Sequence, residues 1–200
     1  MERFVFILPY YAMQIQKMKK NRAILLDRDG VINVDYGHVH TIKKFDFVDG
    51  IFELTLEAFK KGYMIIVITN QGGIGRGYYT EQDFHNLTSW MCERFMEQGV
   101  PITKVYYSPY HPISGLGIYK KEDFSRKPNP GMILQSEKDF ELNLESSLLH
   151  GDKESDIQAG LAAGISKNFL FSPEIKLADS NFCIDKAHQV TRLFEIIPFL

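Results

Sequence analysis

Short apolar runs alternate with amphipathic stretches along most of this chain, and this alternation limits the possible folds more than any other feature. Five runs rich in Ile, Val, Leu and Tyr cover residues 23–26, 64–68, 104–107, 147–149 and 168–171. Short, continuous apolar runs are typical of strands that are buried on both faces of a parallel sheet. Repeated strand–helix units place helices on both faces, through right-handed crossovers. We therefore predict an α/β fold with a doubly wound parallel sheet.

Helical signals lie between and after these runs. Thr80 and Asp83 have the spacing of a capping box, and apolar residues then follow at intervals of three and four until Gly99 and Pro101. By similar patterns we predict helices over residues 51–61, after Pro130–Gly131, over 155–163 and, as a closing helix, over 190–197.

We predict one domain over residues 21–200, preceded by an N-terminal extension, residues 1–20. The extension contains the apolar stretch FVFILPYYAM, which is broken by Pro9 and is too short for a membrane span. It also lacks the basic start of a secretory signal. Two interpretations stay open: a segment that packs on the domain or a partner, or a start codon assigned too early, with Met18 as the alternative start.

Composition excludes several classes of function. A formal net charge of −2 over 200 residues indicates no strongly basic surface for nucleic acid. Cys92 and Cys183 are too few for a disulfide framework or a cysteine zinc cluster. We therefore predict a cytoplasmic protein that binds neither nucleic acid nor a membrane. The oligomeric state stays open, with a monomer as our expectation, and the expected partner, a small molecule, follows only from the motifs described below.

Polar residues follow the apolar runs where each predicted strand ends. In doubly wound sheets ligands bind at the carboxyl ends of the strands, so these side chains are expected to meet at one mouth. They are Asp27 and Asp29, then Thr69, Asn70 and Gln71, then Arg126 and Lys127, and finally Asp152, Lys153 and Asp156.

The residue types in this set favour phosphoryl transfer. Asp27 and Asp152 offer the hard oxygen ligands that Mg²⁺ selects. Thr69 and Asn70 offer a hydroxyl, an amide and backbone N–H groups to a phosphate oxygen, and Lys127 adds a cation that can hold both phosphate and nucleophile. Acids, a metal site, a lysine and small donors are what transfer through an aspartyl-phosphate requires.

The motifs DRDGVIN, TNQ, RKPNPGM and GDKESD together resemble the four motifs of the haloacid dehalogenase superfamily of phosphatases. The resemblance implies a Rossmann-like core with a minimal or absent cap domain. It implies that Asp27 attacks phosphorus, that Asp29 moves protons, and that Thr69 and Lys127 complete the catalytic set. It also implies Mg²⁺ held by Asp27, the Asp29 backbone carbonyl and Asp152.

Residues 21–165 are similar to a narrower family, the D-glycero-D-manno-heptose 1,7-bisphosphate 7-phosphatases. The similar segments are DRDGVINVDYGHVH, FDFVDGI, TNQGGIGRGYYTEQDF and RKPNPGM. The resemblance implies removal of the 7-phosphate in nucleotide-activated heptose biosynthesis for bacterial surface polysaccharide. The implied substrate contacts are Asp35, Tyr36, Gly37, His38, Thr69, Asn70, Gln71, Gly72, Arg126, Lys127 and Lys153.

The sequence departs from this family in one loop. Many members hold a structural zinc with three cysteines and a histidine, and the four aligned positions here are Ser108, Tyr110, Asp123 and Ser125. Because serine is a poor zinc ligand, we predict that structural zinc is absent. The loop must then hold Arg126 by packing and hydrogen bonds.

Several residues have competing interpretations. We expect Arg28 to point away from the two neighbouring acids by strand alternation and to be structural. Asp156 is interpreted as an orienting residue rather than a metal ligand. His38 is assigned to a substrate loop and His40 to a structural role.

Alternative functions also stay open. They are a histidinol-phosphate phosphatase, a polynucleotide 3′-phosphatase, because such enzymes carry a similar TNQ…GIGRG segment, and a non-catalytic phosphosugar-binding protein.

Overall fold

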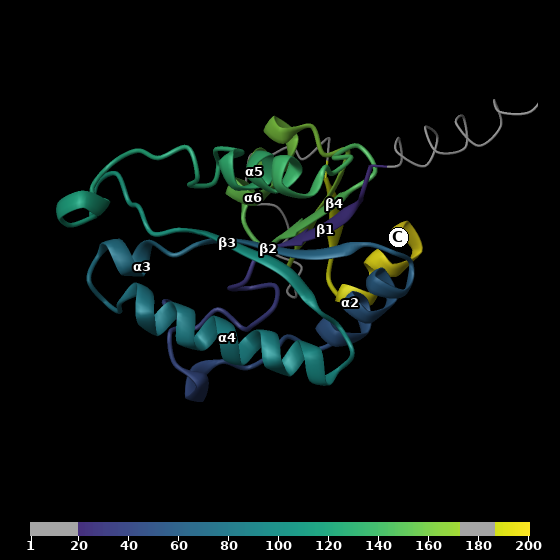
Figure 1. Cartoon of the computed structure of the whole chain (residues 1–200), viewed down its shortest axis with the longest axis horizontal. Helices are drawn as coiled ribbons and strands as arrows, with labels where there is room; N and C mark the ends of the chain where they lie inside the picture. Colours follow the sequence, from purple (N-terminus) through teal and green to yellow (C-terminus); the bar gives the residue numbers. More distant parts are fainter. Residues whose placement is uncertain (1–19, 173–186) are drawn as a thin grey trace, which may run out of the picture.

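The computed structural model describes residues 20–172 and 187–200. Its strands form one six-stranded, all-parallel sheet (Figure 1). The strand order is β3-β2-β1-β4-β5-β6. The strands are β1 (Ala23–Leu26), β2 (Met64–Asn70), β3 (Ile102–Ser108), β4 (Leu148–Gly151), β5 (Lys167–Phe171) and β6 (His188–Val190). This sheet confirms the predicted fold class.

Helices cover both faces of the sheet (Figure 1). On one face lie α2 (Ile51–Lys60), α4 (Glu81–Glu97) and the 3₁₀ helix η3 (Leu193–Phe199), and on the other lie α5 (Gly131–Phe140) and α6 (Glu154–Ala163). The central strand β1 supplies both cores, because Ile24 and Leu26 pack on the first face while Ala23 and Leu25 pack on the second. Such burial on both faces explains why the strands are continuous apolar runs.

The start of α4 is the capping box that the sequence predicts. The Thr80 hydroxyl accepts from the Asp83 N–H at 3.1 Å, and the Asp83 carboxylate accepts from the Thr80 N–H at 2.8 Å. The remaining elements are one-turn pieces in loops: η1 (Ile42–Lys44), α3 (Gly72–Gly75) and η2 (Gly117–Tyr119). Within the described residues the connections between strands hold no separate cap domain.

A closing helix is present as predicted, but it is a 3₁₀ helix over Leu193–Phe199, so the predicted bounds of 190–197 are wrong. Val190 belongs to β6, where it pairs with Phe171, and η3 begins only at Leu193. Glu195 accepts from the Arg192 N–H at 3.1 Å, which fixes this later start. Leu193 and Ile196 are buried at a spacing of three, which is the 3₁₀ period, and Pro198 has no N–H with which to continue an α-helix.

Two segments, residues 1–19 and 173–186, lie outside the described residues, so the interpretation of the N-terminal extension and Cys183 are not addressed by the structure. In the part of the chain that the structure describes, no helix is both long and apolar enough to cross a membrane.

Candidate active site

The carboxyl ends of β1, β2 and β4 meet at the point where the strand order reverses. From β1 the chain crosses to β2 on one side, whereas β4, later in the chain, lies on the other side. A crevice at such a switch point is the usual ligand site of a doubly wound sheet. Asp27 follows β1, Thr69 lies near the end of β2, and Asp152 follows β4. The sequence therefore placed these residues at the correct edge.

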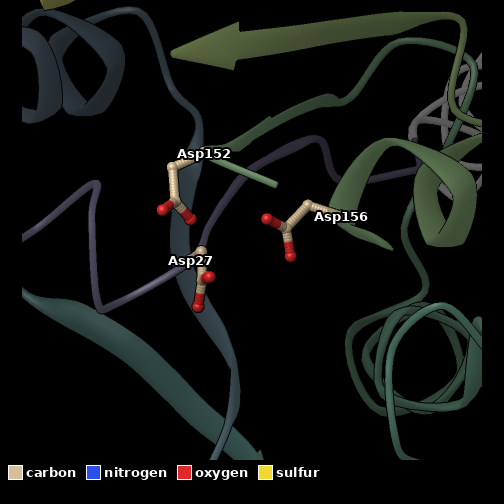
Figure 2. A group of neighbouring side chains, drawn as sticks. All are labelled: Asp27, Asp152 and Asp156. Carbon is tan, nitrogen blue, oxygen red and sulfur yellow. The ribbon is translucent and has the colours of Figure 1, made fainter. Parts of the chain in front are cut away.

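Three carboxylates converge at this edge. Asp27, Asp152 and Asp156 each offer an oxygen, and these oxygens lie within 4.8 Å of one another (Figure 2). Gly30 lies beside them with φ +95°, and a Cβ at this position would collide with the Asp152 carboxylate. A side chain is thus excluded both by backbone conformation and by space.

Lys127 lies between the acids. Its Nζ is 3.0 Å from Asp27 Oδ1 and 2.6 Å from Asp156 Oδ1, and it donates to the Ile68 carbonyl at 2.8 Å. The side chain is only 2% exposed, so these three partners replace its hydration shell. Asp156 is engaged on its other oxygen too, since Oδ2 accepts from the Lys153 N–H at 2.9 Å. Both Asp156 oxygens therefore face protein donors, which fits an orienting role.

Burial and charge shift the pKa values of this cluster. Burial raises the pKa of Asp27 to about 7, against the opposing effect of Lys127 and with a further contribution from Asp156. Burial also raises the pKa of Asp152. Burial alone would lower the pKa of Lys127, but Asp156 and Asp27 outweigh it and raise that pKa.

The donor set fits a divalent cation. Asp27 and Asp152 provide hard oxygen ligands, the missing side chain of Gly30 leaves room for the Asp152 carboxylate, and the acids repel one another without a counter-charge. Asp27 and Asp152, with the Asp29 backbone carbonyl that the superfamily resemblance adds, are the groups that would hold Mg²⁺.

Asp29 is surrounded by donors. The Arg28 Nη2 lies 2.8 Å from both carboxylate oxygens, Gln71 Nε2 donates at 2.9 Å and Asn33 Nδ2 at 3.1 Å. The expectation that Arg28 points away from the acids is therefore wrong for Asp29. The chain turns directly after β1, where the Arg28 carbonyl accepts from the N–H groups of Ile32 and Asn33, so strand alternation no longer applies. Arg28 is structural as expected, since it also donates to the Val39 carbonyl.

The TNQ segment mostly supports its neighbours. Asn70 Nδ2 donates to the Lys127 carbonyl at 2.9 Å, and its Oδ1 accepts from the Lys127 N–H at 3.0 Å. Gln71 donates to Thr69 Oγ1 at 2.9 Å and accepts from the Tyr79 hydroxyl. The Asn70 and Gln71 side chains thus contact Lys127, Thr69 and Asp29. Their contacts with substrate stay a prediction. Thr69 is buried, as is Gln71.

The predicted substrate loop reaches the acidic centre through one ion pair. Lys153 Nζ lies 3.1 Å from Asp35 Oδ2 and 3.2 Å from Asp152 Oδ2. Tyr36 donates to Asp46 at 2.9 Å, and Gly37 adopts φ +77°. The loop's remaining predicted contact, His38, packs edge-on against the Tyr78 ring. Asp35 and Lys153 are therefore the members of this set that the structure brings to the site.

His40 contacts Tyr79 and the backbone of the same loop. Its ring stacks on that of Tyr79 at 5.0 Å, and its Nδ1 lies 2.7 Å from the His38 carbonyl. These contacts fit the structural role expected for it.

Two arginine side chains, Arg126 beside Gly72 and Arg76 near Arg126, form what we call the cationic rim. A Cβ at Gly72 would lie 3.3 Å from Arg126 Nη1, and Arg126 donates to the Tyr110 carbonyl at 3.0 Å. Burial lowers the pKa of Arg126, and the nearby Arg76 lowers it further. In the described ranges neither guanidinium has a carboxylate within 4.0 Å. Arg76 was missed, although its place shortly after TNQ was an available signal.

Comparison with known proteins decides the family. Residues 26–190 match the family model described as polynucleotide kinase 3 phosphatase. A Burkholderia mallei protein named D-glycero-alpha-D-manno-heptose-1,7-bisphosphate 7-phosphatase is 53% identical over 182 residues, covering 90% of this chain and 94% of that protein. The chain belongs to the heptose bisphosphate phosphatases of the haloacid dehalogenase superfamily.

Other family members agree with this assignment. The Haemophilus influenzae D-glycero-beta-D-manno-heptose-1,7-bisphosphate 7-phosphatase is 45% identical over 75% of this chain and 81% of its own. The D,D-heptose 1,7-bisphosphate phosphatase of B. bronchiseptica, solved with magnesium and phosphate, shares the fold with a TM-score of 0.76 at 22% identity, covering 88% of this chain and 96% of that one. The chain is thus a phosphatase that hydrolyses phosphate monoesters.

The loop positions at which many heptose bisphosphate phosphatases hold zinc are joined here by other contacts. Ser125 Oγ lies 3.0 Å from Ser108 Oγ and donates to Asp123 Oδ1 at 2.6 Å. The Tyr110 ring lies 4.0 Å from the Lys121 ammonium, which also pairs with Asp123. The absence of zinc stays a prediction.

His150 in β4 gives this phosphatase a predictable sensitivity to acid. Both ring nitrogens are buried and lack hydrogen-bond partners in the described residues, and burial lowers the pKa to about 3. The folded pKa lies below that of the unfolded chain, so the folded state binds fewer protons, and stability is lost as the pH falls below about 6.5. Between pH 7 and pH 5 the protonation of His150 alone should lower the free energy of unfolding by about 2 kcal/mol.

Urea unfolding of the wild type and His150→Leu at pH 7 and pH 5 measures this cost. The wild type should lose about 2 kcal/mol more than the variant. Equal losses in the two proteins would mean that His150 is not the acid-sensitive group.

Proposed function

We propose that this phosphatase removes the 7-phosphate of D-glycero-D-manno-heptose 1,7-bisphosphate through an aspartyl-phosphate, with Mg²⁺ as cofactor, in nucleotide-activated heptose biosynthesis for bacterial surface polysaccharide. The observation that carries the proposal is the meeting of Asp27, Lys127 and Asp152 at one strand edge, with Lys127 Nζ 3.0 Å from Asp27 Oδ1. The names of the relatives at 40–53% identity support the substrate.

In this proposal Asp27 is the nucleophile. Its Oδ1 accepts from the Arg28 N–H at 2.7 Å and pairs with Lys127, which fixes the direction of the carboxylate. A carboxylate oxygen forms a bond to phosphorus while the bond from phosphorus to the sugar oxygen breaks. Lys127, which contacts Asp27 directly, stabilises the negative charge shared between nucleophile and phosphoryl group. When bound, Mg²⁺ supplies further charge neutralisation for the phosphoryl oxygens.

Asp29 carries the protons. In the first step its carboxyl group gives a proton to the departing sugar oxygen, and in the second it accepts one from the water that attacks the aspartyl-phosphate. Phosphate leaves and Asp27 is restored as a carboxylate. Arg28, Gln71 and Asn33 hold Asp29 in one orientation for both steps.

A bisphosphate substrate matches the charge around the mouth. Arg126 and Lys153 are cations that take no part in the ion pair between Lys127 and Asp27. Arg76 adds a third cation near Arg126. One phosphate requires the catalytic lysine, whereas a second phosphate requires cations of its own.

A substrate panel tests this assignment. We expect kcat/KM for heptose 1,7-bisphosphate to exceed that for histidinol phosphate and for a 3′-phosphorylated oligonucleotide by at least about 100-fold. Histidinol phosphate has no second phosphate, and the further phosphates of an oligonucleotide are singly charged backbone diesters. Both anomers belong in the panel, since one relative is named for the alpha and another for the beta form.

The oligonucleotide is the decisive competitor in this panel. The matched family model is named for polynucleotide 3′-phosphatases, but a net charge of −2 provides little attraction for a nucleic-acid backbone. A higher kcat/KM for the oligonucleotide would overturn the heptose assignment.

A further inference from the structure

Two backbone carbonyls hold Arg126. Its Nη1 donates to the Tyr110 carbonyl at 3.0 Å, and its main-chain N–H donates to the Asp123 carbonyl at 3.0 Å. An arginine side chain has five N–H donors. Within the described residues its guanidinium makes no other hydrogen bond, so the remaining donors are available to a ligand. The position of these donors therefore depends on where Tyr110 and Asp123 lie.

Lys121 touches both of those residues. Its Nζ lies 2.9 Å from Asp123 Oδ2 and 4.0 Å from the centroid of the Tyr110 ring. The other Asp123 oxygen, Oδ1, accepts from the N–H of Ser125 at 3.0 Å and from its hydroxyl at 2.6 Å. One ammonium group thus joins the two ends of the loop at the residues whose carbonyls hold Arg126.

The loop is anchored separately to the rest of the domain. Glu81 at the start of α4 accepts from the Tyr119 hydroxyl at 2.7 Å and from the Tyr107 hydroxyl at 2.8 Å. The Leu116 N–H donates to the Gly75 carbonyl at 2.7 Å. The fold of the loop therefore does not depend on Lys121 alone, and a change at Lys121 acts mainly on the spacing of Tyr110 and Asp123.

We propose that Lys121 is a positioning residue for Arg126: by joining Tyr110 to Asp123 it sets where the guanidinium meets the second phosphate of the substrate. The inference rests on the proposed function, because only a bisphosphate brings a second phosphate to Arg126. Lys121 itself does not touch the substrate. Its two contacts are partly exposed, and such contacts are individually weak, so the effect is several-fold rather than complete.

Lys121→Met removes the ammonium group and keeps an unbranched side chain of similar length. We expect kcat/KM for heptose 1,7-bisphosphate to fall about threefold to tenfold, mainly through a higher KM. The change for para-nitrophenyl phosphate, a small monoester with no second phosphate, should be much smaller. Lys121→Arg should recover the bisphosphate activity, because a guanidinium also pairs with carboxylates and packs on aromatic rings. Lys120→Met, one residue away and exposed, is the matched control and should change neither substrate.

A double variant shows whether Lys121 acts through Arg126. In an Arg126→Gln background, Lys121→Met should cause no further loss on the bisphosphate. Losses that multiply, or an equal loss on both substrates in the single variant, would overturn the inference. Failure of the proposed function is seen separately, because the unmodified enzyme would then show no preference for the bisphosphate over the monoester.

Discussion

Asp27→Asn lowers the turnover of heptose 1,7-bisphosphate by at least about 10⁴-fold, the size of loss expected when a covalent nucleophile is removed. Asparagine has nearly the same shape but cannot form the acyl-phosphate bond. Lys127 keeps Asp156 as a partner at 2.6 Å, so the fold should persist. Steady-state phosphate release measures the loss, and urea unfolding checks that the variant is folded.

Asp139→Asn is the matched control. Asp139 lies in α5 and accepts from Tyr106 and Gln135, so the same change there removes a charge without touching the site. Its turnover should equal that of the wild type. Appreciable turnover by a pure Asp27→Asn preparation would rule out the covalent route.

Lys127→Met has the largest expected effect on stability. The lysine is the cation shared by two buried acids, Asp27 and Asp156, and its loss leaves their charges uncompensated beside Asp152. Removing one partner of a buried ion pair costs about 3–5 kcal/mol, or roughly 10 °C in Tm for a chain of this size. Unfolding is measured at pH 8 in magnesium-free buffer. Turnover should be lost as well.

The pH dependence separates charge from packing in this variant. The folded pKa of Asp27 is about 7 with Lys127 present and rises further without it, so Asp27 takes up a proton as the pH falls. The destabilisation should therefore be smaller at pH 5.5 than at pH 8. Lys153→Met, at a side chain that is 52% exposed, should cost at most about 1 kcal/mol. A destabilisation by Lys127→Met that is small, or independent of pH, would contradict the charge argument.

The sheet and its long helices could be predicted because their signals are local and strong. Central strands are buried on both faces and read as apolar runs, and α4 carries both a capping box and a regular apolar spacing. The short strand β6 lacks such a signal. Two of its three residues are exposed, and it lies at the edge of the sheet. Its apolar Val190 was therefore assigned to the following helix.

The motif residues were placed at the correct edge because the carboxyl ends of neighbouring parallel strands must lie together. Errors arose where the chain leaves regular structure. Arg28 was assigned by strand alternation, but the turn that follows β1 brings it to Asp29. The contact between the Asn70 amide and the Lys127 backbone, which is 57 residues away in sequence, was not predicted. No local pattern encodes such a contact.

The cationic rim was only partly predictable for the same reason. Arg126 precedes Lys127 within a motif, whereas Arg76 lies near Arg126, and Lys121 contacts Tyr110, through the folding of separate loops. Arg76 follows the TNQ segment closely, but Lys121 has no such signal in the sequence. Only the positions of Gly72 and Tyr110 in three dimensions reveal which cations gather beside Arg126.

Rapid acid quenching of the enzyme during turnover, followed by peptide mass spectrometry, tests the central claim most directly. The mechanism predicts that one phosphoryl group is added to the peptide that contains Asp27, that it is located on that carboxylate, and that it is missing in Asp27→Asn. A phosphoryl group on another side chain, or full turnover with no phosphorylated peptide at any quench time, would contradict the role assigned to Asp27.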